Sequence, residues 1–523
     1  MKKFLIIILI ILTASTVFSK PENKVDFKSF SASLDNQTYI DANNILMFVN
    51  NFGGFGYDRG GVFGYGYGTF YPYHGVDEIY SGLSSTSPIY NAGIWIGGKV
   101  DGGIRVATSE YSTEFVPGPM AEGTFQNDDP SFKVYKLYAD SMGTNPNDDY
   151  NNWPISDGAP VDGADNPWLI GQQLLWSVFN DAKTLQHFAY GTDPLGVEVQ
   201  QTVFAASYES NTIYIKYKIY NKGGDQIDSC YFTLWVDPDL GSPGDDLVGC
   251  DTLKNMFYVY NDGVSDYDYG SSPPAAGFQF IHGPLVPAPG ESGYFESTLV
   301  PDYKNLDMSS SFRIINGIDP NDADEVYGYM KGLLGYSASP YIYNGDTLTY
   351  ECSGDPVGGT GDLDPFSADK RMIGTVGPFD FAPGDSQYVM IRMAVGQGMS
   401  TLSSISDLKM RFSIPFNYPT DVDDITPAGL PDRFELAQNY PNPFNPTTTI
   451  SYRLPTKAKV TLEIFNILGQ KVATLIDAEQ TAGTHKVEWN GTNEAGDQVT
   501  TGVYLYRLST DKFKQTKKMM LLK

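Results

Sequence analysis

Two long stretches in the middle of the chain, residues 197–206 and 212–220, alternate apolar with polar side chains. Successive side chains of a β-strand point to opposite faces, so this period of two predicts strands with one buried face. The segment NKGG at residues 221–224 supplies a turn after the second stretch. We therefore expect the pair to form the centre of an antiparallel β-sandwich.

The composition extends this expectation to the whole chain. The 54 glycines and 33 prolines, with abundant tyrosine, favour short strands joined by tight turns. A chain of 523 residues is long enough for two or three sizeable cores. The sequence predicts an all-β, multi-domain protein, with a β-sandwich body over residues 76–425, divided into two sandwiches, and a C-terminal immunoglobulin-like sandwich.

The acidic charge of the chain lies in its body. The formal net charge is −27, whereas residues 431–523 hold 12 Lys and Arg against 9 Asp and Glu. Such a negative field disfavours nucleic acid and anionic lipid, because contacts to phosphates need cationic side chains. It suits a soluble surface, divalent cations or neutral glycans.

The N-terminal segment, residues 1–19, has the pattern of a signal peptide. Two lysines precede an apolar run at residues 4–12, and Val17 and Ser19 occupy the minus-three and minus-one positions of a signal-peptidase site. The apolar run is much shorter than the roughly 20 residues that a membrane-spanning helix needs. We expect export, removal of this segment, and no transmembrane span in the mature chain.

A polar leader, followed by a segment rich in glycine and aromatic residues, is expected over residues 20–75. Its second half interleaves glycine with Phe and Tyr, as at residues 53–57 and 64–67. Aromatic rings on a glycine-rich backbone either stack on sugar faces or pack against a sheet. Burial is the commoner fate of aromatic side chains, so we expect packing.

Five carboxylates follow the predicted strand at residues 230–236 within a stretch rich in Gly and Pro. They are Asp237, Asp239, Asp245, Asp246 and Asp251. Their repulsion is relieved by water or by a bridging cation, and calcium accepts about six to eight oxygen ligands at irregular angles. The loop is not an EF-hand, since Ser242 and Val248 stand where that motif needs Gly and Glu. The sequence leaves two interpretations open, an open, solvated acidic loop and a calcium site held by these carboxylates.

A weaker candidate for the same chemistry is a second acidic cluster further along the chain. It consists of Asp319, Asp322, Asp324 and Glu325.

Three cysteines, Cys230, Cys250 and Cys352, permit one disulfide on an oxidising export route. Cys230 with Cys250 is one possible pairing, and the sequence does not choose among them. No CxxC pair occurs, which disfavours a structural zinc site.

The sequence contains no recognisable catalytic motif. None of its four histidines lies in an HExxH, and no GxSxG occurs. We therefore assign no catalytic residue and no organic cofactor. Glycoside hydrolysis needs only two carboxylates about 5–10 Å apart. A glycan-binding protein or a glycoside hydrolase, with exposed Trp and Tyr as platforms, is thus the alternative to a structural or binding role.

The C-terminal part begins with the segment NYPNPFNP at residues 439–446. Its prolines exclude helix and central strand, because proline fixes φ and lacks an N–H. We expect a rigid, extended linker over residues 426–446. Beyond it, short alternating segments separated by glycine-containing turns predict about seven strands over residues 447–523, which is typical of an immunoglobulin-like sandwich.

These residues closely resemble the type IX, or Por-type, C-terminal sorting domain of the Bacteroidetes and their relatives, whose fold is like the flagellar hook-capping immunoglobulin module. The residues that carry the resemblance are Asn439, Pro441, Asn442, Pro443, Phe444, Pro446, Gly469, Trp489, Gly491, Gly502, Tyr504 and Lys518. The resemblance implies recognition by an outer-membrane secretion machinery and cleavage as the cargo is released or anchored to surface lipopolysaccharide. An ordinary terminal sandwich without a signalling role is the alternative.

The body resembles secreted proteins of related bacteria that carry the same sorting domain and for which no activity is known. Residues 95–98, 176–181 and 237–241 carry this resemblance, which implies a shared architecture and no particular chemistry. We therefore expect a secreted or cell-surface structural or binding protein that reaches the exterior through the periplasm. Its expected partners are the type IX machinery and surface lipopolysaccharide or glycans, and not nucleic acid.

Overall fold

The computed structural model of the protein describes two parts of the chain. The first covers residues 36–416 apart from 60–67, 74–85, 122, 127–128, 140–146 and 206–208; the second covers residues 434–521 apart from 437–438, 440–441, 443, 445, 455–457, 468, 481–482 and 511. The predicted signal peptide lies outside the described residues. Among the described residues, no helix has both the length and the apolar character needed to cross a bilayer.

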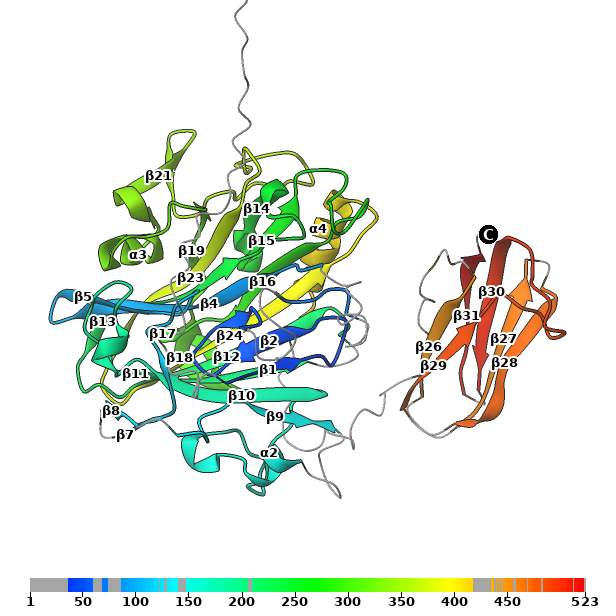
Figure 1. Ribbon diagram of the computed structural model, residues 1–523, viewed down its shortest axis with the longest axis horizontal. Coiled ribbons are helices and arrows are strands. Elements are labelled where there is room, and N and C mark those ends of the chain that lie inside the picture. Colours follow the sequence, from blue (N-terminus) through cyan, green and yellow to red (C-terminus); the bar gives the residue numbers. More distant parts are fainter. Residues whose placement is uncertain are drawn as a thin grey trace, which may run out of the picture.

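Two large antiparallel sheets form the body (Figure 1). The first sheet has the order β1 (Gln37–Ile40), β2 (Met47–Asn50), β3 (Phe55–Gly56), β4 (Asn91–Val100), β13 (Ile227–Asp237), β23 (Lys370–Phe381), β19 (Met308–Ile315), and β5 (Gly103–Thr108) also pairs with β4. The second sheet has the order β14 (Asp246–Asp251), β15 (Met256–Asn261), β16 (Ala275–His282), β24 (Ser386–Gly396), β12 (Thr212–Asn221), β11 (Val197–Ala205), β10 (Gln173–Asn180), β6 (Val116–Pro117), and β9 (Tyr135–Tyr138) also pairs with β10. The two stretches that the alternating pattern singled out are β11 and β12, which pair with each other at the centre of the second sheet.

One hydrophobic core lies between the two sheets. It takes Ile94 and Phe232 from the first sheet and Ile215 and Ile391 from the second. The rings of Phe232 and Tyr217, one from each sheet, lie 5.2 Å apart. Where the sequence led us to expect two sandwiches between residues 76 and 425, the described residues form one large sandwich, because strands far apart in the chain, such as β4 and β23, flank β13 in the same sheet.

The outer faces of both sheets are covered as well. Helix α3 (Ala323–Met330) packs on the first sheet and α4 (Thr401–Arg411) on the second. Each helix lies over a strand glycine: a Cβ on Gly97 would lie 2.7 Å from Met330 Sδ, and one on Gly396 would lie 2.4 Å from the backbone of Leu408. A different segment covers the outer face of β11, where Gln200 donates to the Asp157 carbonyl at 3.0 Å, so all of β11 is buried although its sequence alternates as if one face met water.

Small elements complete the body. The hairpin of β17 (Leu285–Phe295) and β18 (Thr298–Asn305) forms a sheet of its own, as do β20 (Leu333–Leu334), β21 (Ser339–Tyr343) and β22 (Asp346–Leu348). The hairpin of β7 (Met120–Ala121) and β8 (Thr124–Phe125) and the short helix α2 (Asp148–Asn151) lie in connections.

The structure corrects the expectation of a polar leader for the described residues from 36 onward. Within residues 20–75, strands β1 to β3 extend the first sheet, and Met47 and Phe55 are buried in the common core. The aromatic side chains Phe52 and Phe70 are buried too, each 2% exposed. The apolar run after Asn44 therefore forms edge strands that continue the sheet beyond β4 rather than a solvated arm.

The C-terminal part is a separate two-sheet domain with its own core. One sheet contains β25 (Glu435–Leu436), β26 (Thr448–Leu454) and β29 (Gly483–Trp489); the other contains β28 (Lys471–Gln480), β27 (Ala458–Asn466), β30 (Gly502–Ser509) and β31 (Lys514–Leu521). Ile450, Leu462 and Tyr506 are fully buried between the sheets. The predicted all-β class, with a sandwich body and an immunoglobulin-like C-terminal domain, is confirmed.

Candidate functional site

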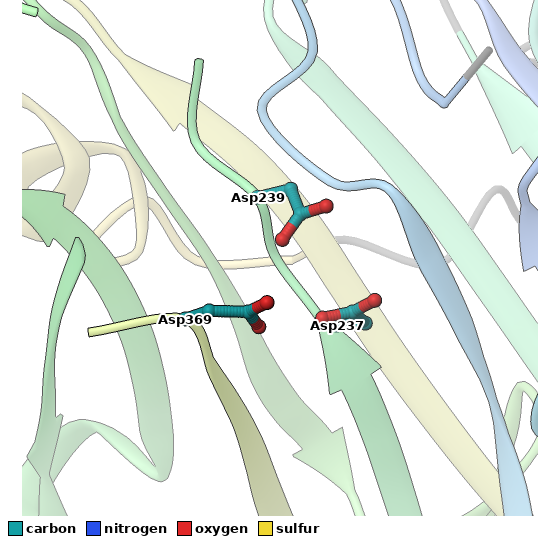
Figure 2. Close-up of side chains that lie close together, drawn as sticks. All are labelled: Asp237, Asp239 and Asp369. Carbon is teal, nitrogen blue, oxygen red and sulfur yellow. The ribbon is translucent and has the colours of Figure 1, made fainter. Parts of the chain in front are cut away.

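Three carboxylates converge at one end of the first sheet (Figure 2). Each of Asp237, Asp239 and Asp369 offers an oxygen within 4.8 Å of the oxygens offered by the others. Asp237 ends β13, Asp239 follows two residues later, and Asp369 directly precedes β23. Because β13 and β23 are antiparallel neighbours, the end of one strand lies beside the start of the other.

A buried arginine shares this acidic cluster, which we define as Asp237, Asp239 and Asp369. Arg371 Nε lies 3.6 Å from Asp237 Oδ1, and its Nη1 lies 3.7 Å from Asp369 Oδ1. Burial acts to lower the pKa of Arg371, but Asp237 and the other acidic groups around it raise the pKa above its usual value. The hydroxyl of Tyr111 donates to Asp237 and accepts from Arg371 Nη2 at 3.3 Å.

The acidic cluster therefore carries three carboxylates against one guanidinium. Its oxygen ligands suit a hard divalent cation, for which calcium has the most tolerant geometry. The same guanidinium compensates part of the negative charge without any metal, so Arg371 and a cation compete for these oxygens.

The other predicted ligands do not join the acidic cluster. Asp246 is fully buried and accepts from Leu240 N at 3.0 Å, and burial raises the pKa of its carboxyl well above the usual range. Burial also raises the pKa of Asp245. Asp251 forms an ion pair with Lys409 at 3.5 Å. Sequence proximity brought these carboxylates into the prediction, but β14, which begins at Asp246, runs in the other sheet.

Sequence reasoning missed Asp369 and Arg371. Both lie more than a hundred residues after Asp237 and reach it only through strand pairing. Most of the second acidic cluster has a local explanation: Asp322 caps α3 by accepting from Glu325 N at 2.9 Å, and acidic side chains in the first turn suit the helix dipole. Asp319 lies outside the helix, 4.0 Å from Arg371 Nε.

The three cysteines are free, buried thiols. Burial raises the pKa of each of them. The backbone N–H of Cys250 donates to the carbonyl of Cys352 at 3.0 Å, whereas Cys230 lies in the other sheet. Such thiols are buried packing groups and poor nucleophiles.

Many motif residues of the C-terminal domain form one packed corner. The ring of Trp489 lies 5.6 Å from that of Phe444 and 5.4 Å from that of Tyr504. Its Nε1 donates to the carbonyl of Thr492 at 2.9 Å. Asn439 is 2% exposed, and its backbone N–H donates to the Tyr506 hydroxyl at 2.8 Å.

The segment predicted as a linker belongs in part to this domain. Phe444 N donates to the carbonyl of Met520, and Asn442 Oδ1 accepts from Met520 N. The ring of Phe434 stacks on that of Phe513 at 5.6 Å. The described part of the domain thus begins by Phe434, before the predicted boundary at 447, because the extended segment pairs with the end of β31.

The remaining motif residues serve turns or face solvent. Gly469 and Gly491 have φ of 77° and 73°, which L side chains rarely adopt. Asn442, Pro446 and Lys518 are exposed, Gly502 begins β30, and Pro441 and Pro443 lie outside the described residues. A hollow of about 360 Å³ beside the corner is lined by Glu488, Asn490 and Glu494 among others.

Comparison with known proteins gives one match at the level of a family and several weak structural likenesses. The family model described as the FlgD Ig-like domain matches residues 441–512. No curated protein matches the chain.

Among solved structures the chain is similar to a polysaccharide lyase at 9% identity, covering 62% of this chain and 34% of the lyase, with a TM-score of 0.19. It is similar to an Escherichia coli protein described as an aldose 1-epimerase at 8% identity, covering 70% of this chain and 100% of that one, with a TM-score of 0.24. It is similar to PorU of Porphyromonas gingivalis at 13% identity, covering 67% of this chain and 31% of PorU, with a TM-score of 0.17.

The chain spans about a third of the length of the lyase and of PorU. The family match falls on a two-sheet domain with a core of its own, and it establishes that this chain carries a FlgD Ig-like domain at its C-terminus.

Proposed function

We propose that the protein is a secreted or cell-surface structural or binding protein, and that its C-terminal domain directs it across the outer membrane by the type IX route. The observation that carries the proposal is the FlgD Ig-like domain, which closes around its own core and contains the packed Phe444, Trp489 and Tyr504 corner. A domain that folds by itself can be recognised as a unit. The exposed residues Asn442 and Lys518 and the hollow beside Trp489 supply surface for that recognition.

Deleting residues 431–523 is expected to retain the protein in the periplasm of a bacterium that has a type IX system. The deletion removes the whole recognition surface. It leaves the core of the body intact, because no residue of that core lies in the deleted segment. Immunoblotting of periplasmic and medium fractions measures the outcome.

The matched experiment transfers the domain. A periplasmic reporter fused to residues 431–523 is expected to appear outside the cell, while the same reporter with a signal peptide alone stays in the periplasm. Normal appearance of the truncated chain in the medium, or retention of the fused reporter, would contradict the sorting role.

We further propose that calcium binds the acidic cluster and stabilises the body. What supports this is the convergence of Asp237, Asp239 and Asp369. Those side chains would hold the ion and tie the start of β23 to the end of β13. A ligand bound only by the native state stabilises it by about 2.7 kcal/mol at a hundredfold excess over Kd, so Tm should rise by several degrees with calcium and fall with chelator.

Two variants locate the ion. Asp369→Asn is expected to abolish the calcium-dependent shift in Tm, measured by calorimetry, whereas Asp251→Asn keeps it because Asp251 pairs with Lys409 elsewhere. An unchanged Tm of the parent protein on chelation would remove calcium from the proposal. Loss of the shift in Asp251→Asn alone would place the ion on the loop and not on the acidic cluster.

A further inference from the structure

A pocket of about 260 Å³ lies on the outer face of the second sheet. Its floor is a cross-strand row in which Trp176 of β10, Thr202 of β11 and Lys216 of β12 are direct neighbours. The residues adjacent to them in sequence, such as Val203 and Ile215, face the common core, so the row faces away from it. The pocket and the acidic cluster thus belong to different sheets.

Two separate segments form the walls. On one side, the loop at residues 158–161 is held by its Pro160 carbonyl, which accepts from Trp153 Nε1 at 2.9 Å and from Trp168 N at 3.1 Å. The Gln200 side chain crosses beneath this loop and donates to the Asp157 carbonyl at 3.0 Å. On the other side stands the turn of the β17–β18 hairpin, which carries Glu296.

The charged residues that line the pocket carry a net positive charge, although the chain as a whole is acidic. Glu296 lies 3.1 Å from Lys216 Nζ and 3.8 Å from Lys218 Nζ. Burial raises the pKa of Glu296, but the two lysines lower it further, so the net shift is downward and the carboxyl stays ionised. The lining residues therefore include two cations and one anion, an excess of one positive charge in a chain of net charge −27.

We propose that this pocket binds a single sugar ring that carries a carboxylate, as at a uronate end of a glycan chain. The volume lies just below the usual range for pockets of drug-sized ligands, which suits a ligand of about one ring. The part-exposed indole of Trp168 offers apolar surface to the ring, and Gln200, Glu296 and Ser297 offer hydrogen bonds to its hydroxyls. The unbalanced lysine charge selects a carboxylate over a neutral ring.

The proposal concerns binding and not hydrolysis, and it does not depend on the export route. Among the lining residues, Glu296 is the single carboxylate, whereas glycoside hydrolysis needs a pair. Lys218 is the part-exposed cation, with 27% of its side chain accessible, so it is the group able to reach a ligand. Lys216, at 6%, fixes Glu296 from below.

Isothermal titration of the purified protein with galacturonate and with galactose tests the proposal. We expect galacturonate to bind, galactose to bind at least about tenfold more weakly, and the galacturonate affinity to fall as salt rises, because a charge-assisted contact is screened. Lys218→Met is expected to weaken galacturonate binding about tenfold or more. Its matched control is Lys99→Met, an exposed lysine on β4 of the other sheet, which should leave binding unchanged.

Trp168→Phe keeps an aromatic ring in the wall of the pocket but makes it smaller. This variant should weaken the binding of galacturonate and of galactose by a similar factor. Thermal melting of each variant shows that the body is folded, and the chain lacking residues 431–523 should bind as the parent does. Absence of binding up to about 10 mM galacturonate, equal affinity for galactose, or unchanged affinity in Lys218→Met would overturn the proposal.

Discussion

Replacing Asp364 by Ala is expected to lower the free energy of unfolding of the body by about 3–5 kcal/mol, the largest effect of any substitution considered in the body. Asp364 Oδ1 lies 2.5 Å from Arg313 Nη1, and its Oδ2 lies 2.5 Å from Lys370 Nζ. The side chains of Asp364 and Lys370 are fully buried. Removing the carboxylate therefore leaves a buried ammonium without its counter-charge, and that desolvation cost is not recovered elsewhere.

The network of Asp364, Arg313 and Lys370 also links parts of the body, so losing the carboxylate affects more than stability. Val248 N of the second sheet also donates to Asp364, at 3.0 Å, so the carboxylate joins β14 to the first sheet. Lys370 is the first residue of β23 and stands between Asp369, a member of the acidic cluster, and Arg371, which pairs with that cluster. The Asp364→Ala variant is thus expected to weaken calcium binding together with stability.

Denaturant unfolding, followed by the fluorescence of the body tryptophans, measures the change. The control is Asp355→Ala: Asp355 is half exposed in its pair with Lys409, so its loss should cost less than about 1 kcal/mol. Asp364→Leu combined with Lys370→Met removes both charges of this buried pair and should recover part of the lost free energy of unfolding. Equal destabilisation by Asp364→Ala and Asp355→Ala would show that the network contributes no more than a surface pair.

Replacing Trp489 by Ala is expected to unfold or nearly unfold the C-terminal domain and so to stop export. Trp489 is 2% exposed and contacts Phe444 and Tyr504, and a buried Trp→Ala change costs about 3–5 kcal/mol. A domain of this size has about 5–15 kcal/mol of stability in total, with small domains at the low end. The variant chain should accumulate in the periplasm as the deletion of residues 431–523 does.

The matched control is Ile467→Ala in the β27–β28 turn. Ile467 is 72% exposed, so its truncation should change stability by less than about 0.5 kcal/mol and leave export unchanged. Circular dichroism of the isolated domain measures folding, and fractionation of cells measures export. Normal export of a Trp489→Ala chain whose domain is shown to be unfolded would mean that a linear motif, and not the folded sandwich, is recognised.

The strands of this protein were largely predictable because their signals are local. Alternation at residues 197–206 and 212–220 predicted β11 and β12, and Gly469 predicted the turn between β27 and β28. Local signals were weaker where the partner of a segment is distant. Residues 45–49 read as the end of a polar leader because the sheet that β1 to β3 extend continues at β4, which pairs with β3 and begins more than forty residues after β2.

The candidate sites divide in the same way. The carboxylates Asp237 and Asp239 were found from sequence because they are close along the chain, and Asp245, Asp246 and Asp251 were grouped with them for the same reason. The structure separates these three and adds Asp369, because strand order and not chain distance determines which side chains meet. The pocket beside Trp176 had no sequence signal, since its lining comes from three strands, a loop and a hairpin.

By itself, the sequence determined the β class of the protein, the acidity of its body and the presence of a C-terminal immunoglobulin-like domain, since side-chain periodicity, composition and turn residues act over a few neighbouring positions. Only the tertiary structure decided that the body has one common core, that Arg371 sits among the carboxylates, and that Lys218 and Glu296 meet in the pocket that Trp176 also lines. These outcomes depend on the order of strands within two sheets, and that order is set by burial of apolar surface summed over the whole body rather than by any one segment.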